Sequence, residues 1–229
     1  MDRSASSLSP CGPPPFLVAH RAGNHLPALR EAERLGITHV EADVRLFRGR
    51  LEVRHLKTVG PLPLYWDRWT VQPPWRPRLE LHELLQATAD DTELVLDLKG
   101  RRRTLAERVL ESIGPYLGAR RFTVCARTWH LLEAFSGTPV RSVHSVGTAR
   151  QLHAILRRFA GQRLQGISIH ERLLDAHSVA AVRTVADTIM TWPVNRPERA
   201  RELLGLGVDG LITDDAAAIA YASVLRRTA

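Results

Sequence analysis

Short apolar segments alternate with amphipathic, helix-like segments along almost the whole chain, and this regularity constrains the fold most. We predict eight strands, at residues 16–20, 38–44, 93–98, 121–125, 140–144, 165–169, 187–192 and 208–213. Helical patterns lie between most of them, at residues 25–35, 103–113, 147–160, 175–185 and 196–205. Such alternation favours an α/β fold with a parallel sheet, and eight units favour closure into a (β/α)8 TIM barrel. No Gly-rich dinucleotide fingerprint follows the first strand, which counts against a Rossmann fold.

The length and composition fit one domain of this kind. Barrels of about this length, 229 residues, commonly stay undivided, and no apolar run approaches the length of a membrane span. Residues 1–15 are rich in Ser and Pro, so we expect a disordered leader before a barrel at residues 16–229. The two cysteines, Cys11 and Cys125, suggest neither a disulfide framework nor a zinc site. We therefore expect a reducing, cytoplasmic setting.

The net charge of +8 and the pI of about 10.6 raise the question of a nucleic-acid partner. The positive charge is spread along the whole chain, without a basic tail or a nucleic-acid motif, so we expect no such partner. Almost all of this charge is Arg, because Lys57 and Lys99 are the only lysines. Lysine is a compact point charge that arginine does not replace, which makes these two positions candidates for a specific role.

One segment after the second predicted strand interrupts the alternation. Arg48 and Gly49 separate two apolar runs and predict a hairpin over residues 45–54. Residues 60–78 then contain five prolines and three of the five tryptophans, a composition that excludes a helix and makes a poor strand. We expect this Trp/Pro-rich segment to form a short cap over the mouth of the active site. A loop folded onto the barrel, or an aromatic edge that contacts lipid, are the alternatives.

The stretch THVEADVRL, residues 38–46, carries two carboxylates inside a segment that otherwise has the pattern of a buried strand. Glu41 and Asp43 are two residues apart, so their side chains point to the same face of the strand. Two unpaired carboxylates that face a protein interior are costly, because desolvation favours their neutral forms. They need a cation or a solvent-filled cleft, and the simpler alternative is a solvated strand face.

Further polar residues recur where the other predicted strands end, which is where the active site of such a barrel lies. The first strand ends in His20-Arg21, the hairpin ends in His55, and the third strand carries Asp97 and Lys99 on one face. The last two strands end in Trp192-Pro193-Val194-Asn195 and in Thr213-Asp214-Asp215.

This set of side chains is suited to the cleavage of a phosphodiester. Three carboxylates, from Glu41, Asp43 and Asp97, are hard oxygen ligands for Mg²⁺ or Ca²⁺. Histidines act as general acid and base near neutral pH, and Arg or Lys side chains bind a phosphate. A metal and cations would stabilise charge on the phosphoryl oxygens while the imidazoles move protons.

The same motifs resemble the glycerophosphodiester phosphodiesterase family. The likeness rests on AHRAGN at the first strand, VEADV on the second, LEVRH, LDLKG and TWPVN, and it ends with GVDGLITD on the last strand. It extends over roughly residues 16–216, in the order that is expected for the family. The sequence departs from the family in that Leu56 follows His55 where an Asp is usual, and Asp97 stands where a Glu is usual.

The resemblance implies that one divalent cation, Mg²⁺ or Ca²⁺, binds Glu41, Asp43 and Asp97. It implies that His20 and His55 are the acid–base pair and that Arg21 and Lys99 bind the phosphate. Asn24 would order the loop after the first strand, and Trp192 would support the site. A neighbouring glycerol hydroxyl would attack first, and the cyclic phosphate would then open to glycerol 3-phosphate.

Three functions remain open at this point. The first is metal-dependent hydrolysis of glycerophosphodiesters, small-molecule substrates, to glycerol 3-phosphate and an alcohol. The second is a lipid phosphodiesterase of the lysophospholipase D or sphingomyelinase D type. It would act on a lysophospholipid, and the Trp-rich segment would provide peripheral contact with a membrane. The third is a barrel that binds phosphate esters without turnover, and the departures at Leu56 and Asp97 keep this alternative open.

Overall fold

Eight parallel strands close into a barrel in the computed structural model, which describes residues 15–59, 62–67, 70–72 and 78–217. The strands are β1 (Phe16–Ala19), β2 (His39–Phe47), β7 (Glu93–Leu98), β8 (Phe122–Ala126), β9 (Arg141–Val146), β10 (Leu164–His170), β11 (Ala186–Trp192) and β12 (Gly210–Thr213). Each pairs with its neighbour in this order, and β1 pairs with both β12 and β2, so the ring is complete. The predicted (β/α)8 barrel is confirmed, with all eight strands within a few residues of their predicted positions.

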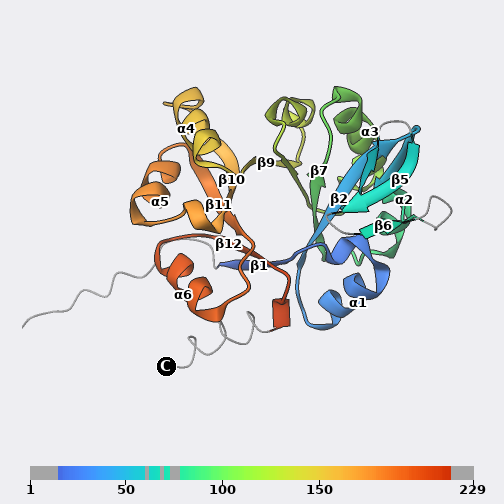
Figure 1. Cartoon of the computed structure of the whole chain (residues 1–229), viewed down its shortest axis with the longest axis horizontal. Helices are drawn as coiled ribbons and strands as arrows, with labels where there is room; N and C mark the ends of the chain where they lie inside the picture. The colour runs from blue at the N-terminus through green and yellow to red at the C-terminus, as the bar shows by residue number, and fades with distance from the viewer. Residues whose placement is uncertain (1–14, 60–61, 68–69, 73–77, 218–229) are drawn as a thin grey trace, which may run out of the picture.

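Helices surround this ring, as Figure 1 shows. They are α1 (Leu26–Arg34), α2 (Leu81–Ala87), α3 (Arg103–Ile113), α4 (Ala149–Arg158), α5 (Ala176–Arg183) and α6 (Pro197–Gly205). Short 3₁₀ turns accompany them, η1 (Ala22–Asn24), η2 (Gly114–Tyr116), η3 (Trp129–Phe135) and η4 (Glu171–Leu173). Of the six α-helices in the described residues, five were predicted. The exception, α2, begins with a capping box between Glu80 and Glu83, and η3 stands where a helix would follow β8.

The two faces of each strand pack against different layers, because successive side chains of a strand alternate in direction. Inside the barrel, apolar side chains from six strands form one cluster, which consists of Val18, Val95, Cys125, Val143, Met190 and Ile212. On β2, the intervening residues Val40, Ala42 and Val44 are fully buried in the layer between the strands and the helices. Glu41 and Asp43 therefore face the interior, towards the carboxyl end of the barrel.

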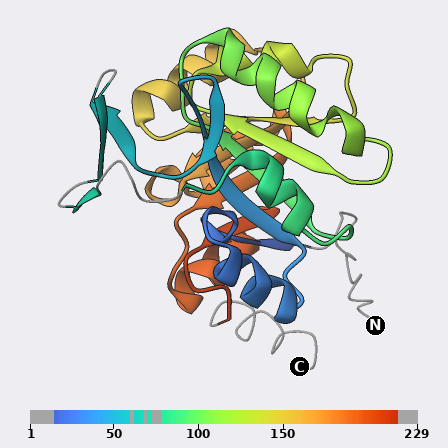
Figure 2. The same ribbon diagram turned by 90° about the vertical axis from the view of Figure 1, so that its right-hand side faces the viewer.

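A hairpin and a small second sheet follow β2. Arg48 and Gly49 both have positive φ angles, 49° and 81°, which join β2 to the antiparallel strand β3 (Arg50–Val53) as predicted. Beyond it, β4 (Lys57–Val59), β5 (Leu62–Asp67) and β6 (Thr70–Gln72) form a three-stranded antiparallel sheet. Figure 2 shows this sheet projecting from the body of the barrel.

The expectation that residues 60–78 make poor strands was therefore wrong for β5 and β6. The pairing of β4 with β5 shifts between Thr58 and Val59, and Pro63 falls in this irregular part, where the ladder needs no backbone N–H. Trp66 is the segment's one tryptophan within the described residues, and it is 39% exposed. Trp69 and Trp75 lie outside the described residues, as does the leader up to residue 14. Within the part of the chain that is described, no helix combines the length and apolar character needed to cross a membrane.

Candidate active site

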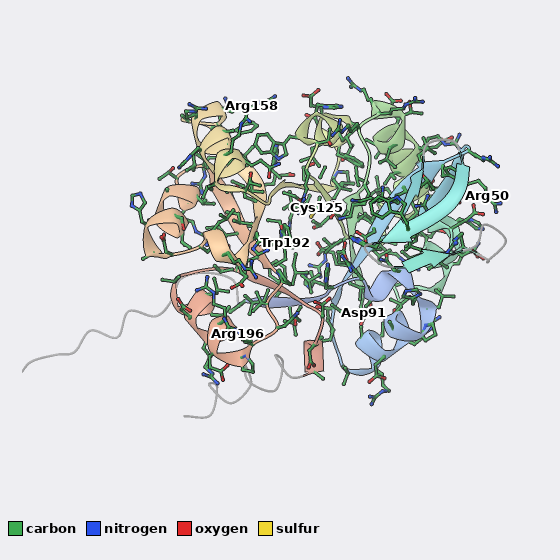
Figure 3. All side chains as sticks on the ribbon, in the orientation of Figure 1. Arg50, Asp91, Cys125, Arg158, Trp192 and Arg196 are labelled. Atoms are coloured by element: carbon green, nitrogen blue, oxygen red, sulfur yellow. The ribbon has the colours of Figure 1, made fainter. Side chains whose placement is uncertain are left out.

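The carboxyl ends of the barrel strands surround a pocket of about 720 Å³. Figure 3 shows Cys125 and Trp192, two of its lining residues, near the middle of the ring, with Arg50 and Arg158 at the periphery. The pocket brings together most of the residues that the sequence singles out. Those that line it are His20, Arg21, Glu41, His55, Lys57, Asp97, Lys99 and Trp192. Asn24 and Asp43 do not line the pocket themselves, but they contact residues that do.

Three carboxylates converge at the base of this pocket. Glu41, Asp43 and Asp97 each offer an oxygen within 4.8 Å of the others. The pairing of β2 with β7 places Asp43 directly beside Asp97, and both strands turn these residues inward. Burial, together with the charges of Asp43 and Asp97, raises the pKa of Glu41 well above its ordinary value. The neutral form of the Glu41 carboxyl is therefore favoured in the absence of a bound cation.

Asp43 is the most enclosed of the three, with its side chain 1% exposed. The Asn24 side chain donates to Asp43 Oδ2 at 2.8 Å and accepts from the Asp43 backbone N–H at 2.8 Å. Lys99 Nζ lies 2.9 Å from Asp43 Oδ1 and also contacts Asp97. Burial acts to raise the pKa of Asp43, but the contacts with His55 and Lys99 outweigh it and hold that pKa far below its ordinary value. Asp43 is therefore ionised at any pH at which the protein is expected to work.

His20 belongs to a chain of hydrogen bonds that links the first strand to the last two. Its Nδ1 lies 2.6 Å from Asp214 Oδ1, and Asn195 Nδ2 donates to Asp214 Oδ2 at 2.8 Å. Because a carboxylate only accepts, the Nδ1 of His20 carries the hydrogen and Nε2 is left with the lone pair. Burial lowers the pKa of His20, although the bond to Asp214 acts in the opposite direction. The ring is therefore neutral at neutral pH.

The sequence reasoning located Asp214 at the active-site end of the last predicted strand but gave it no role in the chemistry. The sequence feature that could have indicated such a role is its position directly after Thr213, at the end of the last predicted strand. In the barrel, β12 pairs with β1 so that Thr213 lies beside Ala19, and the residues that follow these two therefore meet.

His55 and Arg21 contact each other and the acidic cluster. Arg21 Nη2 donates to His55 Nε2 at 3.0 Å, and His55 Nδ1 lies 3.3 Å from Asp43 Oδ2. The acid beside His55 is thus Asp43, which lies on β2, whereas the residue that follows in sequence is Leu56. Arg21 itself has a left-handed backbone, with φ 56° and ψ 10°, and its N–H donates to Glu41 Oε2 at 2.7 Å. This conformation turns the chain sharply after β1 and ties it to β2.

The histidines of β9 and β10, His144 and His170, have different surroundings. His170 lines the pocket and packs edge-on against Trp192, with ring centroids 4.8 Å apart. His144 instead lies between Trp129 and Phe159, at centroid distances of 6.0 and 5.1 Å, outside the pocket. Burial lowers the pKa of His144 to about 4.

The donor set at the base of the pocket fits a hard divalent cation. All three acids offer oxygen atoms, the ligands that Mg²⁺ and Ca²⁺ prefer. Only two protein cations, Lys99 and Arg21, lie within 4 Å of these acids among the described residues. Burial and the two neighbouring carboxylates raise the pKa of Glu41, and a bound cation would oppose both effects.

The fold and the pocket together define a (β/α)8 barrel with an acidic cluster at the carboxyl ends of its strands. No family model matches the sequence, and no curated protein matches it either. Solved structures do match, and three of them show which group of (β/α)8 barrels this fold is similar to.

The first is a phosphodiesterase from Oleispira antarctica in complex with the product sn-glycerol-3-phosphate (17% identity, 92% of this chain and 97% of that chain, TM-score 0.74). The second is a glycerophosphodiester phosphodiesterase from Thermotoga maritima (20% identity, 93% and 99%, TM-score 0.71). The third is a glycerophosphodiester phosphodiesterase from Parabacteroides distasonis (17% identity, 94% and 100%, TM-score 0.72). The chain has the barrel fold of the glycerophosphodiester phosphodiesterases.

Proposed function

We propose that this protein is a metal-dependent phosphodiesterase that hydrolyses glycerophosphodiesters to glycerol 3-phosphate and an alcohol. The observation that carries the proposal is the convergence of three carboxylates, two histidines and two cationic side chains at one end of the barrel. A solved structure with the same fold is a phosphodiesterase in complex with sn-glycerol-3-phosphate, which supports the same reaction here.

Glu41, Asp43 and Asp97 are the residues that would hold the cation. When it is bound, Mg²⁺ or Ca²⁺ supplies Lewis-acid stabilisation of charge on the phosphoryl oxygens. Lys99 already contacts two of these carboxylates, so its ammonium lies at the edge of the same site. In this proposal it binds a phosphate oxygen of the substrate.

His20 is suited to the role of general base. Its Nδ1–H is held by Asp214, which leaves the Nε2 lone pair to accept a proton. The glycerol hydroxyl next to the phosphate would lose its proton to this nitrogen as its oxygen attacks phosphorus. The bond to the leaving alcohol then breaks, and water opens the resulting cyclic phosphate to glycerol 3-phosphate.

His55 is the candidate for the proton donor to the leaving alcohol, and Arg21 controls its availability. In the structure, the Arg21 guanidinium donates to His55 Nε2, so this nitrogen accepts a hydrogen bond and cannot donate one to a leaving group. A bound phosphate monoanion is a stronger acceptor for guanidinium than a neutral imidazole. Substrate binding would therefore draw Arg21 to the phosphate and free His55 to carry a proton.

Release of glycerol 3-phosphate tests the proposal directly. Glycerophosphoglycerol and glycerophosphocholine would be incubated with the protein in EDTA, Mg²⁺ or Ca²⁺, with the His20→Ala variant as the blank. We expect turnover that requires a cation and is lost in the variant. A protein that binds the cation yet hydrolyses neither diester would contradict the proposal, because the site would then bind phosphate esters without turnover.

A second function, cleavage of lysophospholipids, is favoured by one specific observation. Trp66 lies on the projecting β4–β6 sheet, lines the pocket and is 39% exposed, a position from which an aromatic ring could enter a membrane surface. Binding to vesicles, and its loss in a Trp66→Ser variant, would distinguish this function from hydrolysis of water-soluble diesters.

A further inference from the structure

Two tryptophans line the pocket, and each has a cation of the protein itself over its ring. Lys57 Nζ lies 5.2 Å from the ring centroid of Trp66, and Arg127 Cζ lies 5.0 Å from that of Trp192. All four residues line the same pocket. Cation–π contacts of this kind hold a flexible charged side chain in place without neutralising it.

The two cations have no acidic partner among the described residues, where neither Lys57 nor Arg127 forms an ion pair. Both side chains are exposed. Their charge is therefore available to a ligand that enters the pocket.

The acidic residues that line the pocket interact with other groups and contact neither Lys57 nor Arg127. Glu41 and Asp97 belong to the cluster at the base, and Asp214 is bound by His20 and Asn195. No other Asp or Glu of the described residues lines the pocket. The part of the pocket beyond the base is thus positively charged, and its aromatic rings already hold cations.

These surroundings are unfavourable for a cationic leaving group. A quaternary ammonium such as choline is recognised by open aromatic faces with acidic groups nearby. Here an incoming ammonium would meet Lys57 at Trp66 and Arg127 at Trp192, two like charges. The geometry favours the opposite charge.

We propose that Lys57 and Arg127 form an anion-binding subsite that selects diesters whose leaving alcohol itself carries a phosphate or similar anionic group. This inference rests on the proposed phosphodiesterase function and names the substrate class of the same site. Arg45, which also lines the pocket, adds positive charge on the β2 side. A pocket of about 720 Å³ has room for such a leaving group beside the glycerol phosphate.

A matched pair of substrates tests the proposal. Glycerophosphoinositol and glycerophosphoinositol 4-phosphate differ by one phosphate on the leaving alcohol, and glycerophosphocholine provides the cationic comparison. We expect kcat/KM to be at least about tenfold higher for the phosphorylated diester than for glycerophosphoinositol, since charge-assisted contacts are strong. Glycerophosphocholine should be the poorest of the three, and added salt should reduce the differences.

Variants connect the selectivity to the two residues. In the Lys57→Gln/Arg127→Gln double variant, the ratio of the two inositol substrates should fall towards one. Arg150→Gln, which removes an exposed charge on α4 outside this pocket, should keep the ratio. Equal kcat/KM for the two inositol diesters in the parent protein would overturn the subsite while leaving the phosphodiesterase function intact. A ratio that survives in the double variant would also overturn it. No hydrolysis of any diester would overturn the proposed function and the subsite together.

Discussion

The hydrogen bond between His20 and Asp214 provides the sharpest test of the proposed chemistry. Asp214→Asn preserves the shape of the side chain but removes its charge. A hydrogen bond to a charged group contributes about 1.5–3 kcal/mol. The Asp214 side chain is 52% exposed, and water weakens the interaction, so about 1.5 kcal/mol is the appropriate figure. Because about 1.4 kcal/mol corresponds to a factor of ten in rate, we expect kcat to fall about tenfold.

The pH profile of the same variant distinguishes catalysis from structure. The charge of Asp214 raises the pKa of His20 against the effect of burial, which lowers it. Without that charge the pKa of His20 falls further, so protonation of the base occurs at lower pH. The acidic limb of kcat should therefore move to lower pH, as measured by initial rates of glycerol 3-phosphate release between about pH 5 and 9.

Asp215→Asn is the matched control, because it removes the same charge one residue further along the chain. It should change neither kcat nor the acidic limb appreciably. If Asp214→Asn folds normally and retains both the rate and the pH profile of the parent, Asp214 does not position His20 and the assignment of the base is wrong. A shift of the alkaline limb in its place would make His20 the general acid.

Gly23, Glu41 and His144 provide three simpler tests. A Cβ at Gly23 would lie 2.7 Å from Ala42 Cβ, so Gly23→Ala should cost about 1–3 kcal/mol in thermal unfolding, whereas Gly118→Ala, with open space around it, should cost little. Mg²⁺ or Ca²⁺ at about 100 times its Kd should raise the free energy of unfolding by about 2.7 kcal/mol, and Glu41→Gln should lose this increase in Tm measurements. His144 has a pKa of about 4 when folded. Below about pH 6.5, protons therefore bind preferentially to the unfolded chain, and the free energy of unfolding should fall by about 3 kcal/mol towards pH 4. In urea titrations, the His144→Leu variant should largely lack this loss.

Most of the barrel could be predicted from the sequence because its strands are buried on both faces and read as compact apolar runs. Helix α2 was missed because its N-cap is Glu80, which lacks the Ser, Thr, Asp or Asn that usually marks a helix start. The β4–β6 sheet was missed because proline content dominated the interpretation of residues 60–78. A local irregularity in the pairing around Pro63 is enough to admit a strand there, and no local pattern announces it.

The same distinction applies to the site. Features that depend on local spacing could be predicted from the sequence, whereas contacts that form only when the barrel closes could not. The i, i+2 spacing of Glu41 and Asp43 was sufficient to predict that both side chains share a face, and the structure places them together. The partner of His20 was out of reach of such reasoning, because Asp214 is 194 residues away and meets it only once β12 has paired with β1. Similarly, nothing near Lys57 in sequence indicates that Arg127 lines the same pocket.

The charges of the pocket imply an order of binding. Without the cation, the raised pKa of Glu41 favours its neutral form, and within the described residues the charges of Asp43 and Asp97 are matched by those of Lys99 and Arg21. The base of the bare pocket therefore carries no net positive charge to attract a phosphodiester, which is itself an anion. A divalent cation that binds all three carboxylates in their ionised forms gives the base one net positive charge, which a single phosphodiester monoanion neutralises. The bare protein should therefore bind glycerol 3-phosphate weakly and bind it tightly only after the cation. Calorimetric titrations of glycerol 3-phosphate in EDTA and in saturating Ca²⁺ would measure that difference, and equal affinities would mean that the three acids are not the site of the cation.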